Sequence, residues 1–220
     1  MKKIILATAI ALCTTSALAA ETTVMKVEGT LTSSTCDALL GNGGVFDYGT
    51  LSLGELSTTE NNKFAQRSLP VTITCTAPTK VGLRMLDNRS ESNAGIPVQI
   101  NEYSMSATYY TYGVGSTSKG VKIGSYGLLL SNAVADGKTV SIIVRNDDWN
   151  ADLWKSTSSV PRSDDFNTMS FAAAGTTTPV AITQANFDFL TRLVIRDTTS
   201  LAITDDTALD GQATMTLVYL

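Results

Sequence analysis

Apolar and polar residues alternate near the start of the chain. Apolar side chains or glycine occupy every second position from 25 to 31, and charged or hydroxylated residues lie between them. Because side chains of a β-strand point alternately to its two faces, this spacing predicts a strand with one buried face. The positions on that face are Met25, Val27, Gly29 and Leu31.

The same alternation returns in short stretches separated by turn-forming residues, a texture typical of an all-β protein. Residues 184–194 are ambiguous, because Phe187, Leu190 and Val194 fit one helix face while the aromatic and β-branched content fits a strand equally well. The other expected strands are residues 69–76, 81–85, 120–130, 139–145, 178–183 and 212–220.

Residues 146–177 differ from these stretches. They contain paired acids, two tryptophans and a proline, and they show no sustained period. We therefore expect a long loop or insertion there. The leading architecture is one elaborated β-sandwich domain over residues 20–220.

The first residues have the layout of a secretory signal peptide. Two lysines precede an apolar run from Ile4, and Ala17-Leu18-Ala19 forms a small-x-small cleavage site. The apolar run is too short to cross about 30 Å of hydrocarbon. We expect residues 1–19 to be removed, giving an exported chain that starts at Ala20 without membrane insertion. This removal shifts the formal net charge from −4 to −6, which argues against nucleic acid as a partner.

Two of the three cysteines, Cys36 and Cys75, remain in the exported chain. An even pair of cysteines in an oxidising compartment is most simply a disulfide. Closing a loop of about 40 residues stabilises a fold by about 4 kcal/mol on the chain-entropy account.

Candidate catalytic chemistry is sparse. The sequence contains no histidine, which removes the Ser-His-acid triad and the His-containing zinc sites. A Ser-Lys or two-carboxylate enzyme survives that test. The acid pairs at 147–148, 164–165 and 205–206 are interpreted as solvated loop residues. We expect a protein that is not an enzyme and needs no cofactor.

A calcium loop is only partly present. Asp148, Asn150 and Asp152 have the spacing of its first three ligands. Leu153 stands where the sharp turn needs glycine, and Ser159 stands where a bidentate glutamate closes the site. A loose calcium site stays open as an alternative, while the expectation is no metal.

The chain ends in "GQATMTLVYL" (211–220), an alternating run without a polar tail. Chain ends fray unless something holds them. We therefore expect this run to lie in a sheet, paired within its own chain or with a partner.

Several stretches taken together resemble a known family. A signal peptide followed by "VEGTLTSSTC", a second cysteine in a strand, and a penultimate Tyr219 resemble the subunits of bacterial chaperone–usher fimbriae. The closer resemblance is to the GltF-type family of fimbrial-like periplasmic proteins, whose function is not established. It is carried by "GVFDYG" (44–49), "TITCTAPT" (72–79), "DNRSES" (87–92), "TPVAIT" (178–183) and the C-terminal run.

The resemblance implies an immunoglobulin-like, pilin-type sandwich that can lack one strand, which a partner then completes. It places Cys36 and Cys75 in the disulfide bridge, and the expected 25–31 strand first in the domain. Strand addition of this kind uses main-chain hydrogen bonds for affinity. The implied partner-facing edge comprises Gly211, Met215, Leu217 and Tyr219.

The implied partners are a periplasmic chaperone and an usher, or neighbouring fimbrial subunits. The implied location is the periplasm or a cell-surface fimbrium of a Gram-negative bacterium. One departure matters, because rod-forming subunits carry a free donor extension, whereas here only residues 20–23 precede Val24. A fimbrial-subunit-like protein is therefore the leading hypothesis for pilus assembly or cell adhesion. A self-complete periplasmic binding module is the alternative, and a carboxylate enzyme is disfavoured.

Overall fold

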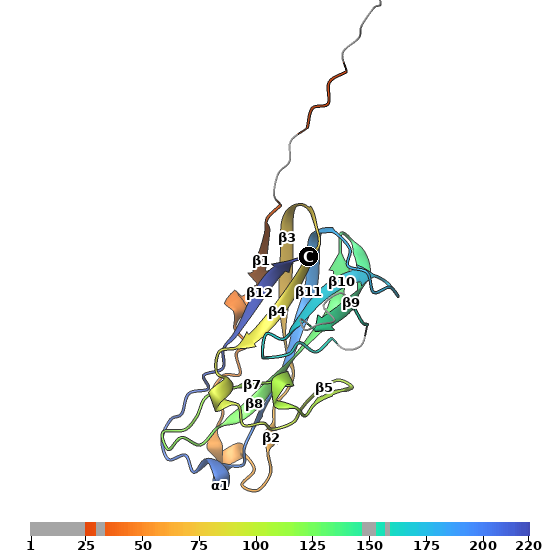
Figure 1. Cartoon of the computed structure of the whole chain (residues 1–220). Helices are drawn as coiled ribbons and strands as arrows, with labels where there is room; N and C mark the ends of the chain where they lie inside the picture. Colours follow the sequence, from red (N-terminus) through yellow and green to blue (C-terminus); the bar gives the residue numbers. More distant parts are fainter. Residues whose placement is uncertain (1–24, 30–33, 147–152, 157–158) are drawn as a thin grey trace, which may run out of the picture. The chain divides into compact units, whose positions relative to one another are not determined.

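The computed structural model describes residues 25–29, 34–146, 153–156 and 159–220. The chain divides into two units, Met1–Ser33 and Ser34–Leu220. The larger unit is built from strands (Figure 1). Its strands are β1 (Cys36–Leu40), β2 (Asn62–Lys63), β3 (Arg67–Thr79), β4 (Val81–Asp87), β5 (Val98–Ile100), β6 (Tyr103–Met105), β7 (Thr111–Gly113), β8 (Gly124–Ala135), β9 (Lys138–Asn146), β10 (Asn167–Ala173), β11 (Ile182–Ile195) and β12 (Ala213–Tyr219).

Helical segments are short. The described α-helix is α1 (Thr198–Leu201), and single 3-10 turns occur at η1 (Gly41–Gly44), η2 (Leu53–Glu55), η3 (Ser90–Ser92) and η4 (Thr108–Tyr110). The "GNGG" turn η1 places Asn42, Gly43 and Gly44 at positive φ. Glycine adopts this backbone region without the steric penalty that other residues carry, so the sequence suits a tight turn directly after β1. No helix of the described residues is long and apolar enough to cross a membrane.

The all-β expectation is confirmed, but the sheet arrangement is more continuous than two separate layers. One ten-stranded antiparallel sheet follows the order β1-β3-β11-β8-β9-β10-β4-β12, with β2 beside β11 and β7 beside β8. The sheet curls into a nearly closed barrel whose two end strands are β1 and β12. The strand order divides into two halves, β1-β3-β11-β8 and β9-β10-β4-β12. The halves are joined at the β8–β9 hairpin by two pairs, Val134↔Thr139 and Ala135↔Lys138. A separate hairpin joins β5 to β6.

The main core lies inside the curled sheet. Its buried side chains come from alternate positions of β3, β4, β8, β10 and β11, because alternate residues share a face. Phe171 and Phe187 approach with ring centroids 5.8 Å apart, and Phe187 meets Phe189 edge to face. The partly buried Met215 and Leu217 of β12 pack against this core from the end of the sheet.

The expected strands at 69–76 and 81–85 are confirmed as parts of β3 and β4. Residues 184–194 belong to β11, which settles the helix-or-strand ambiguity. Expected strands at 120–130 and 139–145 correspond to β8 and β9 with shifted ends. The strand expected at 178–183 begins only at Ile182, although Pro179 bridges to Ala172.

The expectation of a loop throughout 146–177 is wrong for β10. This strand joins β9 to β4 near the middle of one half of the sheet, and all its residues except Ala173 are buried. Its buried polar side chains are hydrogen bonded. Ser170 Oγ donates to the Val81 carbonyl at 2.7 Å, and Arg84 Nε donates to Thr168 Oγ1 at 3.0 Å. A strand covered on both faces has no alternating pattern, so periodicity could not reveal it.

The strand expected at residues 25–31 does not form within the described residues of its unit. Residues 25–29 carry no strand, and the side chains of Met25 and Val27 are 93% and 100% exposed. Leu31 lies outside the described residues, as do residues 1–19. An alternating segment gains burial only when it pairs with another strand, and residues 25–29 pair with none among the described residues.

Candidate functional site

The edge strand β12 contains three of the four residues expected at a partner-facing edge. Met215, Leu217 and Tyr219 lie on β12, one of the two end strands of the main sheet. Gly211 lies two residues before the strand begins. A Cβ there would lie 3.2 Å from the Gly113 carbonyl and 3.1 Å from the Tyr126 ring, so close packing favours glycine at this position. Whether a partner uses these residues is left to the proposal below.

One side of β12 is occupied by β4. Asn88 N donates to the Gln212 carbonyl, and Leu220 N donates to the Lys80 carbonyl, each at 3.0 Å. The pairing between them runs without a register shift. In an antiparallel ladder, alternate residues direct both backbone groups to the same neighbour. Thr214, Thr216 and Val218 therefore bond β4.

The remaining residues of β12 direct their N–H and C=O groups away from β4. These residues are Ala213, Met215, Leu217 and Tyr219, and none has a backbone partner among the described residues. Ala213, Met215 and Leu217 also turn their side chains toward the main core. The same positions thus combine free backbone groups with inward apolar side chains, which is the geometry an added strand needs.

Strand β1 forms the opposite edge. Thr76 N donates to the Thr35 carbonyl at 2.9 Å, and β1 continues along β3 in register. By the same alternation, Asp37 and Leu39 bond β3, whereas Cys36, Ala38 and Leu40 direct their backbone groups to the free side. We call the interval between β1 and β12 the seam. No backbone–backbone hydrogen bond crosses it among the described residues.

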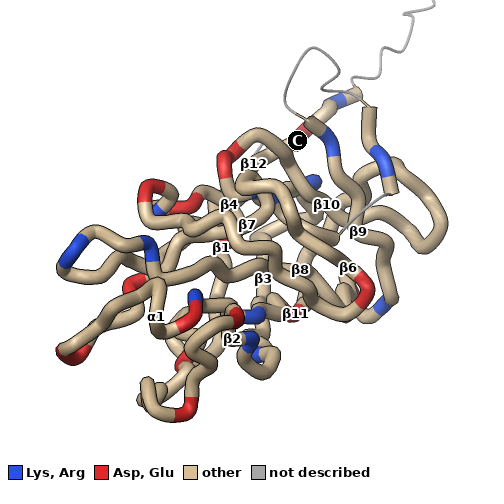
Figure 2. Tube along the Cα trace, turned by 90° about the horizontal axis from the view of Figure 1, so that it is seen from below, with Lys and Arg blue, Asp and Glu red and all other residues tan. Residues whose placement is uncertain are grey.

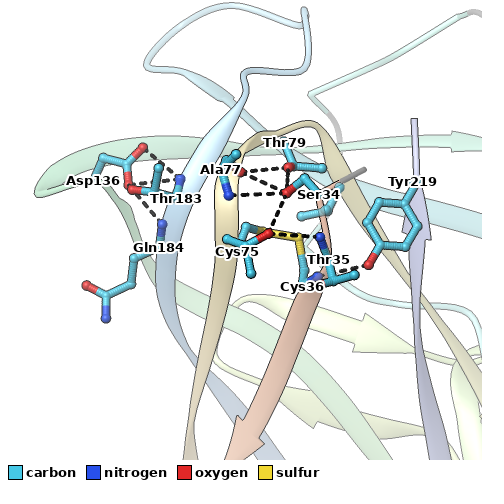
Figure 3. The surroundings of a disulfide bond; sticks show 12 residues. Ser34, Thr35, Cys36, Cys75, Ala77, Thr79, Asp136, Thr183, Gln184 and Tyr219 are labelled. Atoms are coloured by element: carbon cyan, nitrogen blue, oxygen red, sulfur yellow. Dashed lines mark hydrogen bonds between the residues drawn. A yellow bond between two sulfur atoms is a disulfide. The ribbon is translucent and has the colours of Figure 1, made fainter. Parts of the chain in front are cut away.

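Among the described residues, one side-chain hydrogen bond spans the seam, at one of its ends. Cys36 N donates to the Tyr219 phenol oxygen at 2.9 Å (Figure 3). The bond is made by the phenol at the tip of a long side chain and does not pair the two backbones. Tyr219 is 53% exposed, so the contact closes one end of the seam without burying it.

The disulfide fixes the β1 edge at that same end. Cys36 and Cys75 are directly opposite in the β1–β3 register, with Cα atoms 4.0 Å apart, which confirms the expected bridge. Ser34 adds a polar cluster beside it, because its hydroxyl donates to the Ala77 carbonyl at 3.1 Å and accepts from Thr79 Oγ1 at 2.5 Å. Figure 3 shows these residues around the end of β1.

An apolar cavity of about 1120 Å³ opens beside the seam. On the two sides it is bordered by Leu40 at the end of β1 and by Met215 of β12. Its back wall includes core residues Leu69, Leu128 and Phe189. The cavity continues past the ends of the two edges, between residues 44–56 and 201–213. The core is therefore accessible where the sheet fails to close.

The inner cavity is uncharged. Two tyrosines line it, and burial raises the pKa of both Tyr126 and Tyr48 above the ordinary value, so both phenols are neutral at physiological pH. Tyr126 stacks on Tyr112 with ring centroids 5.0 Å apart. Three exposed carboxylates lie on the lining instead: Asp47, Asp205 and Asp206.

The described residues contain no group of three acidic or cysteine side chains that could hold a metal ion. Asp148, Asn150 and Asp152, the ligands of the partial calcium loop, lie outside the described residues. Trp154 lies under Arg145, with the guanidinium carbon 4.9 Å from its ring centroid, which is a local packing contact.

Sequence reasoning missed one wall of the site. β1 is only five residues long, and its exposed Leu39 and Ala38 give it no clear alternation. The acid pair at 205–206 was interpreted as solvated, and both residues are indeed exposed, but they border the cavity. The "GVFDYG" stretch, noticed only for its resemblance, supplies Phe46 and Tyr48 to the lining.

Comparison with known proteins identifies relatives along nearly the whole chain. A family model described as "Protein of unknown function (DUF1120)" matches residues 25–127. "Protein GltF" of Escherichia coli (strain K12) is 31% identical over 242 residues, covering 93% of this chain and 92% of that protein. "Uncharacterized protein YhcF" of the same organism is 28% identical over 224 residues, covering 93% of each.

Proposed function

We propose that this chain, which belongs to the family of GltF, is an exported, non-enzymatic protein of fimbrial-subunit type that accepts an extended strand from a partner at the seam. The observation that carries the proposal is the pair of unpaired strand edges facing each other beside an apolar cavity. The disulfide Cys36–Cys75 supports an oxidising, extracytoplasmic location.

The occupant is a strand because the seam presents unpaired backbone N–H and C=O groups, which an extended strand can bind. Ala213, Met215 and Leu217 present free N–H and C=O groups on one side, and Ala38 and Leu40 do so on the other. An inserted strand satisfies both rows and covers the core side chains behind them. The source of that strand is a periplasmic chaperone or a neighbouring subunit, as the fimbrial resemblance implies, and the partner strand then closes the curled sheet at the seam.

A fusion protein tests strand uptake. A flexible linker and a neutral segment of alternating Val and Thr are appended after Leu220, and the matched control replaces each Val with Ser. The Val fusion is expected to melt several degrees higher as a monomer, because about 1–2 kcal/mol of added stability shifts the melting temperature of a domain this size by a few degrees. Equal melting temperatures for both fusions overturn the proposal.

One observation favours the second candidate, a self-complete binding module. The cavity of about 1120 Å³ is lined mainly by apolar residues, as small-molecule sites are, and is slightly larger than their usual range of roughly 300–1,000 Å³. In that case an apolar fluorophore would gain emission on binding the chain, and it would bind the Val fusion equally well. Loss of fluorophore binding in the Val fusion, but not in the Ser control, supports strand uptake instead.

A further inference from the structure

The charges around the seam indicate the chemistry of the occupant, and this inference rests on the proposed strand uptake. We infer that the inserted strand is apolar at its inward positions and carries lysine or arginine at the end that lies over the cavity mouth, whose lining includes Asp47, Asp205 and Asp206. The partner is therefore a different protein with a basic flank, rather than a second copy of this chain.

The cavity lining is acidic only at its mouth. Its charged residues are Asp47, Asp205 and Asp206, and its described lining contains no lysine or arginine. Asp47 accepts from Gly49 N at 2.7 Å, and Thr204 Oγ1 donates to Asp205 at 3.1 Å, so local bonds orient both carboxylates. None of the three forms an ion pair within the described part of the chain.

Two neighbouring cations have other contacts within the described residues. Lys119 borders an adjacent hollow of about 370 Å³ together with Asp205 and Asp206, but its ammonium contacts the Ala202 carbonyl at 3.5 Å. Arg67 lies over the Tyr48 ring, 5.6 Å from its centroid. Figure 2 shows acidic positions on the loops around α1, with some basic positions among them. Among the described residues, neither of these two cations forms an ion pair with the three mouth carboxylates.

The mouth is continuous with the strand edge. The cavity is bordered by residues between 201 and 213, and β12 begins at the last of them, Ala213. A strand bonded to Met215 and Leu217 therefore has one end beside the cavity that Asp205 and Asp206 also line. A cation at that end gains Coulomb attraction, whereas an acid meets like charges.

The chain's own N-terminal segment fits this mouth poorly. Residues 25–31 of this segment have the required alternation, but residues 20–33 carry Glu21, Lys26 and Glu28, an acidic balance. Within its unit Lys26 already lies 3.8 Å from Glu28. The N-terminal segment of a second copy therefore supplies the apolar pattern but not the positive charge that the acidic mouth favours.

Peptide binding to the full chain tests this. Three labelled peptides share one alternating Val/Thr sequence and differ only in their flanks, which are Lys-Lys, Glu-Glu or Ser-Ser at both ends. Fluorescence anisotropy at low salt is expected to show the Lys peptide binding about three- to tenfold tighter than the Ser peptide, and the Glu peptide weaker. In the D47N/D205N/D206N variant, and at high salt, the three affinities should converge.

The two proposals fail in different ways. If the Ser peptide binds and the Lys peptide binds no tighter, the charge inference is overturned while strand uptake stands. If no peptide binds, although the variant and wild type are equally folded by circular dichroism, strand uptake itself fails.

Discussion

The backbone amide of Cys36 and the phenol of Tyr219 join the first and last strands of the main sheet, which share no backbone–backbone hydrogen bond among the described residues. The residues are 183 positions apart in the chain. This one bond, beside the Cys36–Cys75 disulfide, ties the seam at one end and leaves its remainder open to the cavity. An inserted strand that extends the full length of the seam must displace it.

Substituting Tyr219→Phe removes the bond and keeps the ring. We expect the Cys36 amide to exchange faster with solvent, while the free energy of unfolding falls by no more than about 1 kcal/mol because the bond is exposed. Amide exchange by NMR and urea unfolding measure the two effects. Tyr103→Phe, on the separate β5–β6 hairpin, is the matched control. Unchanged exchange at Cys36 contradicts the assigned bond.

Substituting Leu217→Asp places a carboxylate on the inward face of the edge strand. Leu217 packs against the main core, whereas the neighbouring Thr216 is exposed. We expect Leu217→Asp to lower the free energy of unfolding by about 2 kcal/mol or more, and Thr216→Asp to change it by less than about 0.5 kcal/mol. Chemical unfolding of both variants measures the difference. Equal losses would mean that the side chains of β12 are not oriented as described.

Replacing both Cys36 and Cys75 with Ser removes the bridge of β1. We expect the free energy of unfolding to fall by about 2–5 kcal/mol, because the unfolded chain regains the freedom of a 39-residue separation. Strand uptake should weaken as well, since β1 is one wall of the seam. Mass spectrometry of the wild type without reduction provides the check, and two alkylatable thiols in exported material would contradict the bridge.

The sequence predicts the strands of this fold that have one buried face and one exposed face. Alternation located β3, β4 and the C-terminal strand, because Ile73 and Met85, for example, are buried while their neighbours are less so. It failed for β10, where Met169 and Ser170 are both buried, so that neither face is polar. The disulfide followed from cysteine count and compartment alone.

The candidate site was less accessible to the sequence. Its two edges are β1 and β12, and only the topology of the whole sheet places these strands beside one another. No local pattern reports that Cys36 and Tyr219 meet. The alternation at Met25 and Val27 predicted a strand, yet a strand also needs a neighbour, which residues 25–29 lack among the described residues.

The β8–β9 hairpin predicts an acid sensitivity. The Asp136 carboxylate accepts from the Thr183 hydroxyl at 2.5 Å and from Gln184 N at 2.8 Å, and these bonds, the hydroxyl first, lower the pKa of Asp136. A carboxyl group whose folded pKa is lowered adds stability above its unfolded pKa of about 3.9, and this stability is lost as pH falls through the folded value.

Asp136→Asn should therefore lower stability at neutral pH and flatten the loss of stability on acidification. Asparagine tolerates the positive φ of 46° at this position, so the backbone is preserved. Urea unfolding between pH 2 and pH 7 measures the profile, with Asp37→Asn on β1 as the control. A wild-type profile that coincides with that of Asp136→Asn would contradict this role of the carboxylate.

Hydrogen exchange along β12 tests the open seam most directly. In the purified chain without a partner, the account predicts fast exchange at Met215 and Leu217, whose amides face the seam, and slow exchange at Thr216 and Val218, whose amides bond β4. A bound strand should slow Met215 and Leu217 alone. Equal protection of all four amides in a monomer without any partner would contradict the account, because the seam would then be closed by the chain itself.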